Sequence, residues 1–177
     1  MQRFCGLWAK NCPKWLITLL ACMKTRTSVV GFYDAMSNQA VDFIVKQTEL
    51  RTIFCSNEYI KKVITMKDEG MCPSLDKLVS LDGNIEEHVA AAKMAGVDLH
   101  DFDACENQYR NMEVALEESQ SMDTYIFSYT SGTTGDSKGV KLNHKNILSV
   151  TEAVIKKFPL TPDPCVISYL PYPHSFE

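Results

Sequence analysis

The stretch YIFSYTSGTTGDSKGVKLNH, residues 125–144, decides the fold of this chain. It opens with the β-branched and aromatic run 125–130, which is typical of a strand. A turn rich in Gly, Ser and Thr follows, and the short run 139–142 predicts a second strand. Asn143 and His144 then open a helix with apolar residues at helical spacing, which the prolines from residue 159 onward end. The stretch therefore predicts strand, loop, strand and helix in that order.

The loop between these two strands has the chemistry of a polyphosphate cradle. Its glycines let backbone N–H groups approach oxyanions, and its Ser and Thr hydroxyls donate further hydrogen bonds. Lys138 adds a compact positive charge. It is not a Walker-type loop, because that pattern starting at Gly132 requires glycine where Ser137 stands. A loop of this composition taken alone is more often a plain surface connection, so the order of its residues is what favours phosphate binding.

The chain before residue 98 alternates between helices and strands. A first helix spans 12–24, and its apolar face is expected at positions 15, 16, 19, 20 and 23. Ser37, Ser56 and the Asn84–Glu87 pair predict the starts of three more helices. Strands are predicted at residues 28–33, 52–55 and 77–81, with a last one at 165–170. This alternation predicts an α/β fold whose mostly parallel sheet is built from βαβ crossovers and covered by helices on both faces.

Residues 98–123 differ from the rest of the chain in charge. They hold eight acidic residues and one basic residue, Arg110. We interpret this segment as a solvated connection that contains a short helix around 106–118. An acidic surface that docks a partner is the alternative, although such charge runs are usually solvated faces.

The composition of the 177 residues excludes several classes of protein. With 45% hydrophobic residues and a net charge of −4, the chain is globular and has no basic excess for extended nucleic-acid binding. The seven cysteines show no CxxC spacing and the four histidines do not cluster with them, so no metal site is predicted. The longest apolar run, 15–23, is about half of what a membrane-spanning helix needs; a helix lying on a membrane surface is the alternative.

The order YTSGTTGDSKGVKLNH, residues 129–144, resembles the signature loop of the adenylate-forming (AMP-binding) superfamily. Two other stretches are similar to eukaryotic long-chain acyl-CoA synthetases. One is LWAKNCPKWLITLLACM at 7–23, and the other is the terminal YLPYPHSFE at 169–177. The resemblance covers nearly the whole chain and is weakest in the acidic segment. Ser137 and Gly31 stand where the family often has proline, and Asp136 adds a negative charge to the loop.

The resemblance implies a two-step ligase reaction. A fatty-acid carboxylate attacks the α-phosphorus of ATP and expels pyrophosphate, and the thiol of coenzyme A then attacks the acyl-adenylate. The resemblance further implies a set of loop residues that bind the β- and γ-phosphates of Mg-ATP: Thr130, Ser131, Gly132, Thr133, Thr134, Gly135 and Lys138. It also places His174 near the mouth of the acyl pocket.

The same resemblance predicts that these 177 residues are part of a large N-terminal AMP-binding domain. The parts are a βαβ portion at 1–97, the acidic connection at 98–123 and a phosphate-loop portion at 124–177. The main catalytic groups and a C-terminal domain are expected after Glu177. The isolated chain is therefore expected to lack complete turnover and to be poorly soluble.

Alternatives remain open at this point. The chain can belong to an adenylating enzyme for another carboxylic acid, or to a truncated form that binds nucleotide or partners without turnover. By the resemblance, the expected location is the cytoplasm or the cytosolic face of the endoplasmic reticulum or peroxisome, with peripheral membrane association of the full-length enzyme.

Overall fold

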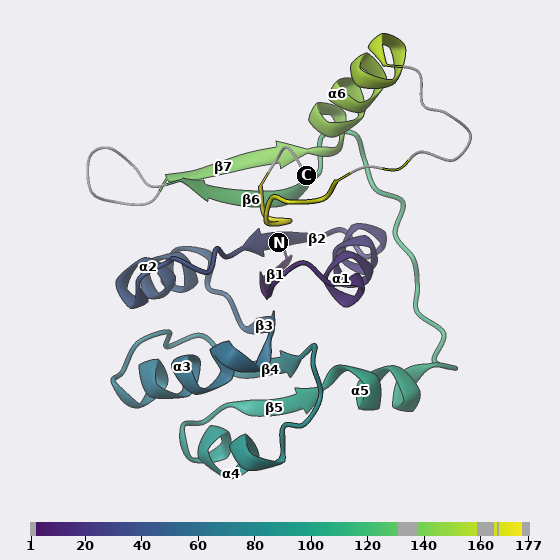
Figure 1. Ribbon diagram of the computed structural model, residues 1–177. Helices are drawn as coiled ribbons and strands as arrows, with labels where there is room; N and C mark the ends of the chain where they lie inside the picture. The colour runs from purple at the N-terminus through teal and green to yellow at the C-terminus, as the bar shows by residue number, and fades with distance from the viewer. Residues whose placement is uncertain (1–2, 131–137, 159–164, 166, 175–177) are drawn as a thin grey trace.

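The computed structural model describes residues 3–130, 138–158, 165 and 167–174, which form one seven-stranded sheet with helices on both faces (Figure 1). The strand order is β5-β4-β3-β1-β2-β6-β7. In chain order, the strands and helices are β1 Arg3–Trp8, α1 Pro13–Lys24, β2 Thr27–Gly31, α2 Asn38–Thr48, β3 Thr52–Cys55, α3 Asn57–Asp68, β4 Lys77–Ser80, α4 Glu86–Met94, β5 Asp98–Asp101, α5 Phe102–Tyr109, β6 Thr124–Thr130, β7 Lys138–Asn143 and α6 His144–Lys157.

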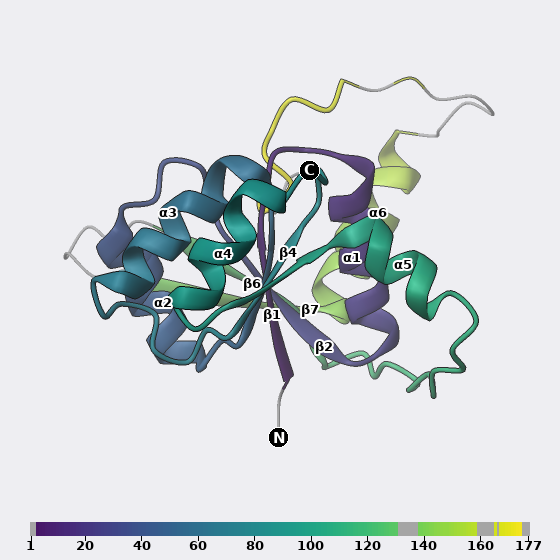
Figure 2. The ribbon, with the colours of Figure 1, turned by 90° about the horizontal axis from the view of Figure 1, so that it is seen from below.

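The sheet confirms the predicted α/β class with mostly parallel strands. All neighbouring pairs are parallel except β6 and β7, which form an antiparallel hairpin. Helices α2, α3 and α4 cover one face, and α1, α5 and α6 lie on the other (Figure 2). The core is accordingly split in two by the sheet. The larger half lies under α2 and α3, and the smaller half holds Trp15 of α1 and Ile126 of β6.

Helices α2 and α3 confirm the predicted periodicity. Their inward positions are all buried, namely Val41, Ile44, Val45 and Thr48 in α2 and Tyr59, Ile60, Val63 and Ile64 in α3. The side chain of Ser37 accepts a hydrogen bond from the Ala40 amide at 3.2 Å and so caps α2 as predicted. Ser56 makes no such bond at the start of α3, where the Asp82 carboxylate accepts from the Asn57 amide at 2.8 Å instead.

The predicted face of the first helix is wrong in part. Helix α1 buries Trp15, Thr18 and Cys22, whereas Leu16 and Leu20 are 45% and 52% exposed. The 15–18–22 stripe is the one that meets the sheet, because residues three and four apart share one helix face. Leucine at 16 and 20 has the hydrophobicity of a core position but lies on the outer side of the helix.

The structure also corrects the prediction for the acidic segment. Residues 98–101 form the edge strand β5, which pairs with β4 alone, and α5 begins at Phe102 instead of near residue 106. The Asp101 side chain caps α5 by accepting from the Ala104 amide at 2.8 Å. The sequence DLHD lacks strand composition, and β5 forms because β4 offers it an unpaired edge.

Two further predictions are wrong. Helix α4 begins at Glu86 without a side-chain cap, because Asn84 adopts a left-handed conformation (φ 54°) and cannot act as the N-cap. Residue 165 and residues 167–170 lie outside the sheet, so no strand is described at 165–170. Ile167 and Tyr169 are 85% and 75% exposed, so neither side chain has the burial expected of a strand inside the sheet.

Candidate nucleotide and acyl site

The β6–β7 hairpin places the two ends of the predicted phosphate loop opposite each other. Thr130, the last residue of β6, pairs in register with Lys138, the first residue of β7. Both residues are exposed, and Lys138 forms no ion pair with any described residue. The loop predictions at Ser131, Gly132, Thr133, Thr134 and Gly135 lie outside the described residues. The described part of the hairpin therefore closes the base of the loop by strand pairing, and it leaves the Lys138 side chain exposed, where it can bind an anion.

Tyr129 fixes the base of this hairpin to the body of the molecule. Its ring is buried, and its hydroxyl donates a hydrogen bond to Gln47 Oε1 of α2 at 2.7 Å. Burial raises the pKa of Tyr129, so the hydroxyl keeps its proton for this bond. Gly139 makes the close approach of the two strands feasible, because a Cβ there would lie 3.1 Å from two ring carbons of Tyr129.

The segment before β6 meets the start of α6. Asn143 and Asn146 cap each other in a capping box, with the Asn146 amide donating to Asn143 Oδ1 at 2.8 Å. The His144 amide donates to the Asp123 carbonyl at 3.2 Å, and the Lys145 amide donates to the Ser121 carbonyl at 2.9 Å. His144 thus belongs to the helix start, where its ring also lies 5.7 Å from that of Tyr125.

The turn that carries His174 crosses the carboxyl end of the same sheet and lies beside β6 (Figure 1). Asn11 holds it by two bonds: its side-chain nitrogen donates to the Leu170 carbonyl at 2.7 Å, and its side-chain oxygen accepts from the Tyr172 amide at 2.8 Å. The ring of Tyr172 packs edge-on against Trp15 with ring centroids 5.2 Å apart. His174 itself is exposed and its amide donates to the Pro171 carbonyl at 2.8 Å.

Pro173 packs against the ends of β2 and β6 and so holds this turn in place. The Tyr33 hydroxyl donates to the Pro173 carbonyl at 3.2 Å and lies 3.4 Å from the Ser128 hydroxyl. A Cβ at Gly31 would lie 2.8 Å from Pro173 Cβ, so the glycine admits the turn at this point. Gly31 and Ser128 are partners in the parallel ladder. The turn before His174 and the base of the phosphate loop therefore meet at one edge of the sheet.

Sequence reasoning missed three residues that build this edge: Asn11, Tyr33 in its hydrogen-bonding role, and Ser128. Their bonds join residues 45 to 161 positions apart in the chain. No local pattern marks such contacts. Only the pairing of β2 with β6 brings the hydroxyls of Tyr33 and Ser128 together.

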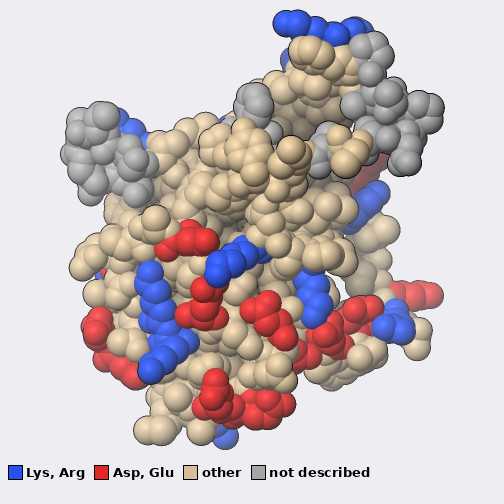
Figure 3. Space-filling model, viewed as in Figure 1, with Lys and Arg blue, Asp and Glu red and all other residues tan. Residues whose placement is uncertain are grey.

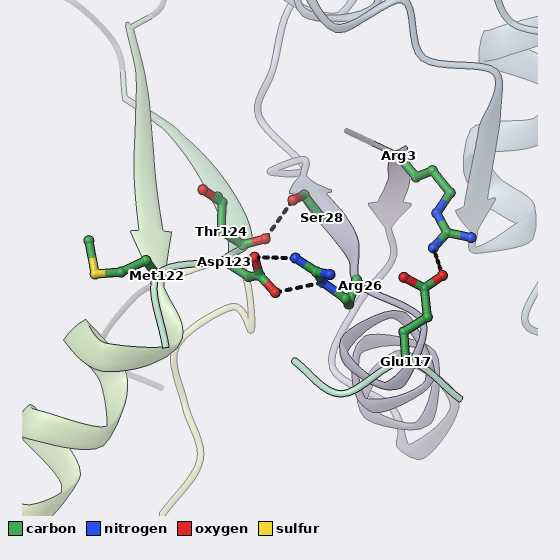
Figure 4. Close-up of a pocket in the computed structure, with 7 residues that line it drawn as sticks. All are labelled: Arg3, Arg26, Ser28, Glu117, Met122, Asp123 and Thr124. Carbon is green, nitrogen blue, oxygen red and sulfur yellow. Dashed lines mark hydrogen bonds and ion pairs between the residues drawn. The ribbon is translucent and has the colours of Figure 1, made fainter. Parts of the chain in front are cut away.

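A polar pocket of about 510 Å³ lies at the opposite, amino edge of the sheet (Figure 4). Asp123 accepts two hydrogen bonds from the Arg26 guanidinium, at 2.8 and 3.0 Å, and Glu117 pairs with Arg3. The Arg26 guanidinium lowers the pKa of the Asp123 carboxyl. Ligands of open α/β sheets bind outside the carboxyl ends of the strands, so this pocket is not the expected nucleotide site.

The acidic connection is thus bound to the chain itself at its C-terminal end. Besides the two ion pairs, the Glu117 amide donates to the Lys24 carbonyl at 3.2 Å and the Ser119 hydroxyl donates to the Met23 carbonyl at 2.6 Å. In the view of Figure 3 the acidic side chains lie mostly over the lower half of the molecule, with basic side chains between them. Residues 117–123 are mostly exposed, as a solvated connection predicts, and they also form these contacts with the start of β1 and the end of α1.

Neither metal ligation nor membrane crossing is visible in the described part of the chain. Across residues 3–130, 138–158, 165 and 167–174, no three His, Cys, Asp or Glu side chains come together as a metal site. None of the described helices has the length and apolarity to cross a membrane.

Comparison with known proteins identifies the class. Residues 2–177 match the family described as AMP-binding enzyme, and the chain belongs to this family. The A-PCP didomain of carboxylic acid reductase (CAR) from Segniliparus rugosus, solved in complex with AMP, has the same fold. Its TM-score is 0.72 at 18% identity, over 84% of this chain and 22% of that one.

The curated proteins with similar sequences include acyl-CoA ligases. The chain is 31% identical to Long-chain-fatty-acid–CoA ligase 1 of Homo sapiens over 99% of its own length and 26% of the relative's. It is 30% identical to the peroxisomal Acyl-CoA ligase 891 of Penicillium brevicompactum, over 97% of its length and 25% of the relative's. The chain spans about a quarter of the length of these curated relatives.

Proposed function

We propose that this chain is part of a long-chain fatty-acid–CoA ligase and that it binds the β- and γ-phosphates of ATP, which leave as pyrophosphate. The observation that carries the proposal is the β6–β7 hairpin, whose paired ends Thr130 and Lys138 close the Gly-, Ser- and Thr-rich loop. Family membership and the long-chain relatives support it.

In this proposal the loop residues bind the β- and γ-phosphates through backbone N–H groups and hydroxyls. They are Thr130, Ser131, Gly132, Thr133, Thr134, Gly135 and Lys138. Lys138 provides positive charge where negative charge grows as pyrophosphate leaves. Bound Mg²⁺ supplies further neutralisation of the phosphates, and coenzyme A is the thiol co-substrate of the second step.

His174 is proposed to border the acyl pocket. The contacts of Asn11, Tyr33 and Ser128 with residues 170–173 support this role, because they hold the turn beside the end of β6. The fatty acid would then approach the nucleotide from the carboxyl edge of the sheet, where the base of the β6–β7 loop and the turn before His174 both lie.

The remaining features of the enzyme are proposed from the relatives. We place residues 1–177 in a large N-terminal domain whose catalytic partners lie on further chain, since the relatives are about four times as long as the matched part. We propose a location in the cytoplasm or at the cytosolic face of the endoplasmic reticulum or peroxisome, with peripheral membrane association of the full-length enzyme; the peroxisomal Penicillium relative supports only the peroxisomal alternative.

Calorimetry with Mg-ATP tests the phosphate grip. Lys138→Ala is expected to weaken binding by about tenfold or more, because a charged hydrogen bond to phosphate contributes about 1.5–3 kcal/mol. Lys141→Ala is the matched control, since Lys141 lies three residues along β7 and its ammonium faces the Phe127 ring at 5.7 Å. Equal affinities of Lys138→Ala and the unmodified chain for Mg-ATP would show that Lys138 does not bind the phosphates.

A further inference from the structure

Helix α1 is apolar on the side that faces away from the sheet as well as on the side that meets it. Its inner side carries the buried Trp15, Thr18 and Cys22. Its outer face is formed by the exposed residues of the helix, which are Pro13, Leu16, Ile17, Leu20, Ala21 and Lys24. A helix that is apolar all round is normally covered all round, so this outer face is a candidate interface.

The two ends of the outer face differ in charge. Lys24 is exposed at the C-terminal end, and no ion pair among residues 3–130, 138–158, 165 and 167–174 includes it. At the N-terminal end, Lys14 pairs at 2.8 Å with Asp103 of α5, which lies on the same side of the sheet (Figure 2). The Asp103 side chain is still 57% exposed, so its carboxylate can accept a second cation.

The apolar residues of the outer face are arranged so that the face complements itself. Leu16 and Leu20 form one ridge along the helix, and Ile17 and Ala21 form the ridge beside it, because residues four apart share a face. When two copies of α1 face each other in opposite directions, a two-fold axis between positions 17 and 20 sets leucine against leucine. It also sets Ile17 of each copy against the small Ala21 of the other.

We propose that the chain forms a two-fold symmetric dimer through the outer face of α1, with the two helices antiparallel. Lys24 of each copy then reaches the end of the other helix at which Asp103 lies, and symmetry makes this ion pair occur twice. An anionic membrane fits the face less well, because the acidic residues Asp103 and Glu117 lie near its two ends. The inference does not depend on the proposed function, since α1 is separate from the β6–β7 hairpin.

Sedimentation of the whole 177-residue chain measures the dimer directly. One pair of helices buries less surface than the roughly 1,200–2,000 Å² of stable complexes, so we expect a weak dimer. Over about 1–200 µM, the range of a micromolar dissociation constant, the mass should rise toward twice the 20.0 kDa of one chain.

Substitutions in α1 test whether its outer face is the interface. Ile17→Ser should raise the dissociation constant about tenfold or more, because each dimer loses two buried isoleucine side chains. Ile17 is 53% exposed in the single chain, so thermal melts should show little loss of stability. Met94→Ser is the matched control: it also removes exposed apolar surface, at a residue 90% exposed at the end of α4 on the other side of the sheet. It should leave the dissociation constant unchanged.

Charge exchange tests the antiparallel direction. Lys24→Glu should raise the dissociation constant roughly five- to tenfold, because two attractive contacts become repulsive. The double variant Lys24→Glu with Asp103→Lys should recover most of this loss, since the exchanged charges again face each other. A double variant that dimerises more weakly than Lys24→Glu alone would contradict the antiparallel arrangement.

Three other results would overturn the proposal. A chain that stays monomeric at every concentration would show that no second copy covers this face, and that further chain of a longer protein is the better candidate. A monomer that binds vesicles of phosphatidylcholine and phosphatidylserine would assign the face to a membrane. Aggregates that Ile17→Ser and Lys24→Glu leave unchanged would show that association does not use α1. The mass of the unmodified chain separates these results even where a variant fails to fold.

Discussion

At the scale of single residues, the β6–β7 hairpin depends on the glycine at position 139 beside the large ring of Tyr129. Gly139 on β7 stands opposite Tyr129 on β6, and the Tyr129 hydroxyl bonds Gln47 on α2. The sequence places Gly139 at the start of the predicted second strand, 139–142. The structure gives it a packing role, because the ring of Tyr129 occupies the space where a Cβ would lie.

Gly139→Ala should therefore destabilise the chain. The added methyl group lies 3.1 Å from two ring carbons of Tyr129, and overpacking of this kind costs about 1–3 kcal/mol in the free energy of unfolding. Urea denaturation measures the loss. The same substitution in a Tyr129→Leu background should cost less, since the clashing ring is gone; equal costs in the two backgrounds would show that the ring is not the cause.

At the scale of elements, the acidic connection is tied to the amino ends of the strands. Arg26 adopts a left-handed backbone conformation (φ 50°) two residues after the end of α1, a position where glycine is the unstrained choice. Its side chain pairs with Asp123, one residue before β6. This pair links the entry to β2 with the entry to β6, two strands that lie side by side in the sheet.

The Arg26–Asp123 pair predicts a dependence of stability on pH. Arg26 lowers the pKa of Asp123 in the folded chain, so the contribution is fully present above the ordinary Asp pKa of about 3.9 and is lost as the pH falls through the lowered value. Asp123→Asn should lower the melting temperature at pH 7 and reduce the loss on acidification. Glu113→Gln, in the same segment and exposed, is the control. Identical pH profiles for Asp123→Asn and the unmodified chain would contradict the prediction.

At the scale of the whole molecule, the two faces of the sheet are covered unequally. Among the residues that the structure describes, 21 are buried in the core under α2, α3 and α4, and nine are buried in the core on the other face. On the less covered face, α1 exposes Leu16, Ile17 and Leu20, and α6 exposes Val154 and Ile155. Such apolar surface promotes association in water.

We expect the isolated chain to associate, and Leu20→Ser to reduce this association without loss of stability. The Leu20 side chain is 52% exposed, so the substitution removes apolar surface that contributes little to the core. Trp15→Ala, at a position 1% exposed in the same helix, should instead cost about 3–5 kcal/mol. Light scattering and thermal melts distinguish the two effects. A soluble monomer with a sharp melt before any substitution would show that the chain is self-sufficient.

The whole molecule also sets an expectation for activity. The chain spans about a quarter of the length of its long-chain ligase relatives, and the roles proposed for its residues are limited to phosphate binding and the border of the acyl pocket. A thioester assay with ATP, palmitate and coenzyme A should therefore detect no sustained turnover by the 177 residues alone. Continued formation of acyl-CoA over many turnovers would refute this expectation.

The sequence by itself determined the α/β class, the hairpin that frames the phosphate loop, the caps at Ser37 and Asn143, and the family. These features depend on local patterns: alternation of apolar runs, turn composition, and hydrogen bonds within a few residues. The individual roles of the loop residues and of His174 stay predictions.

Only the tertiary structure decided that β1 lies in the middle of the sheet and β5 at its edge. It also decided which face of α1 is buried and which residues hold the turn before His174. Each depends on a neighbour far away in the chain: β3 and β2 beside β1, β4 beside β5, and Asn11 and Tyr33 against residues 170–173. Strand composition cannot predict β5, because an edge strand forms where a partner offers unpaired backbone groups. Likewise, α1 has leucines on more than one side, and the sheet alone selects the side that is buried.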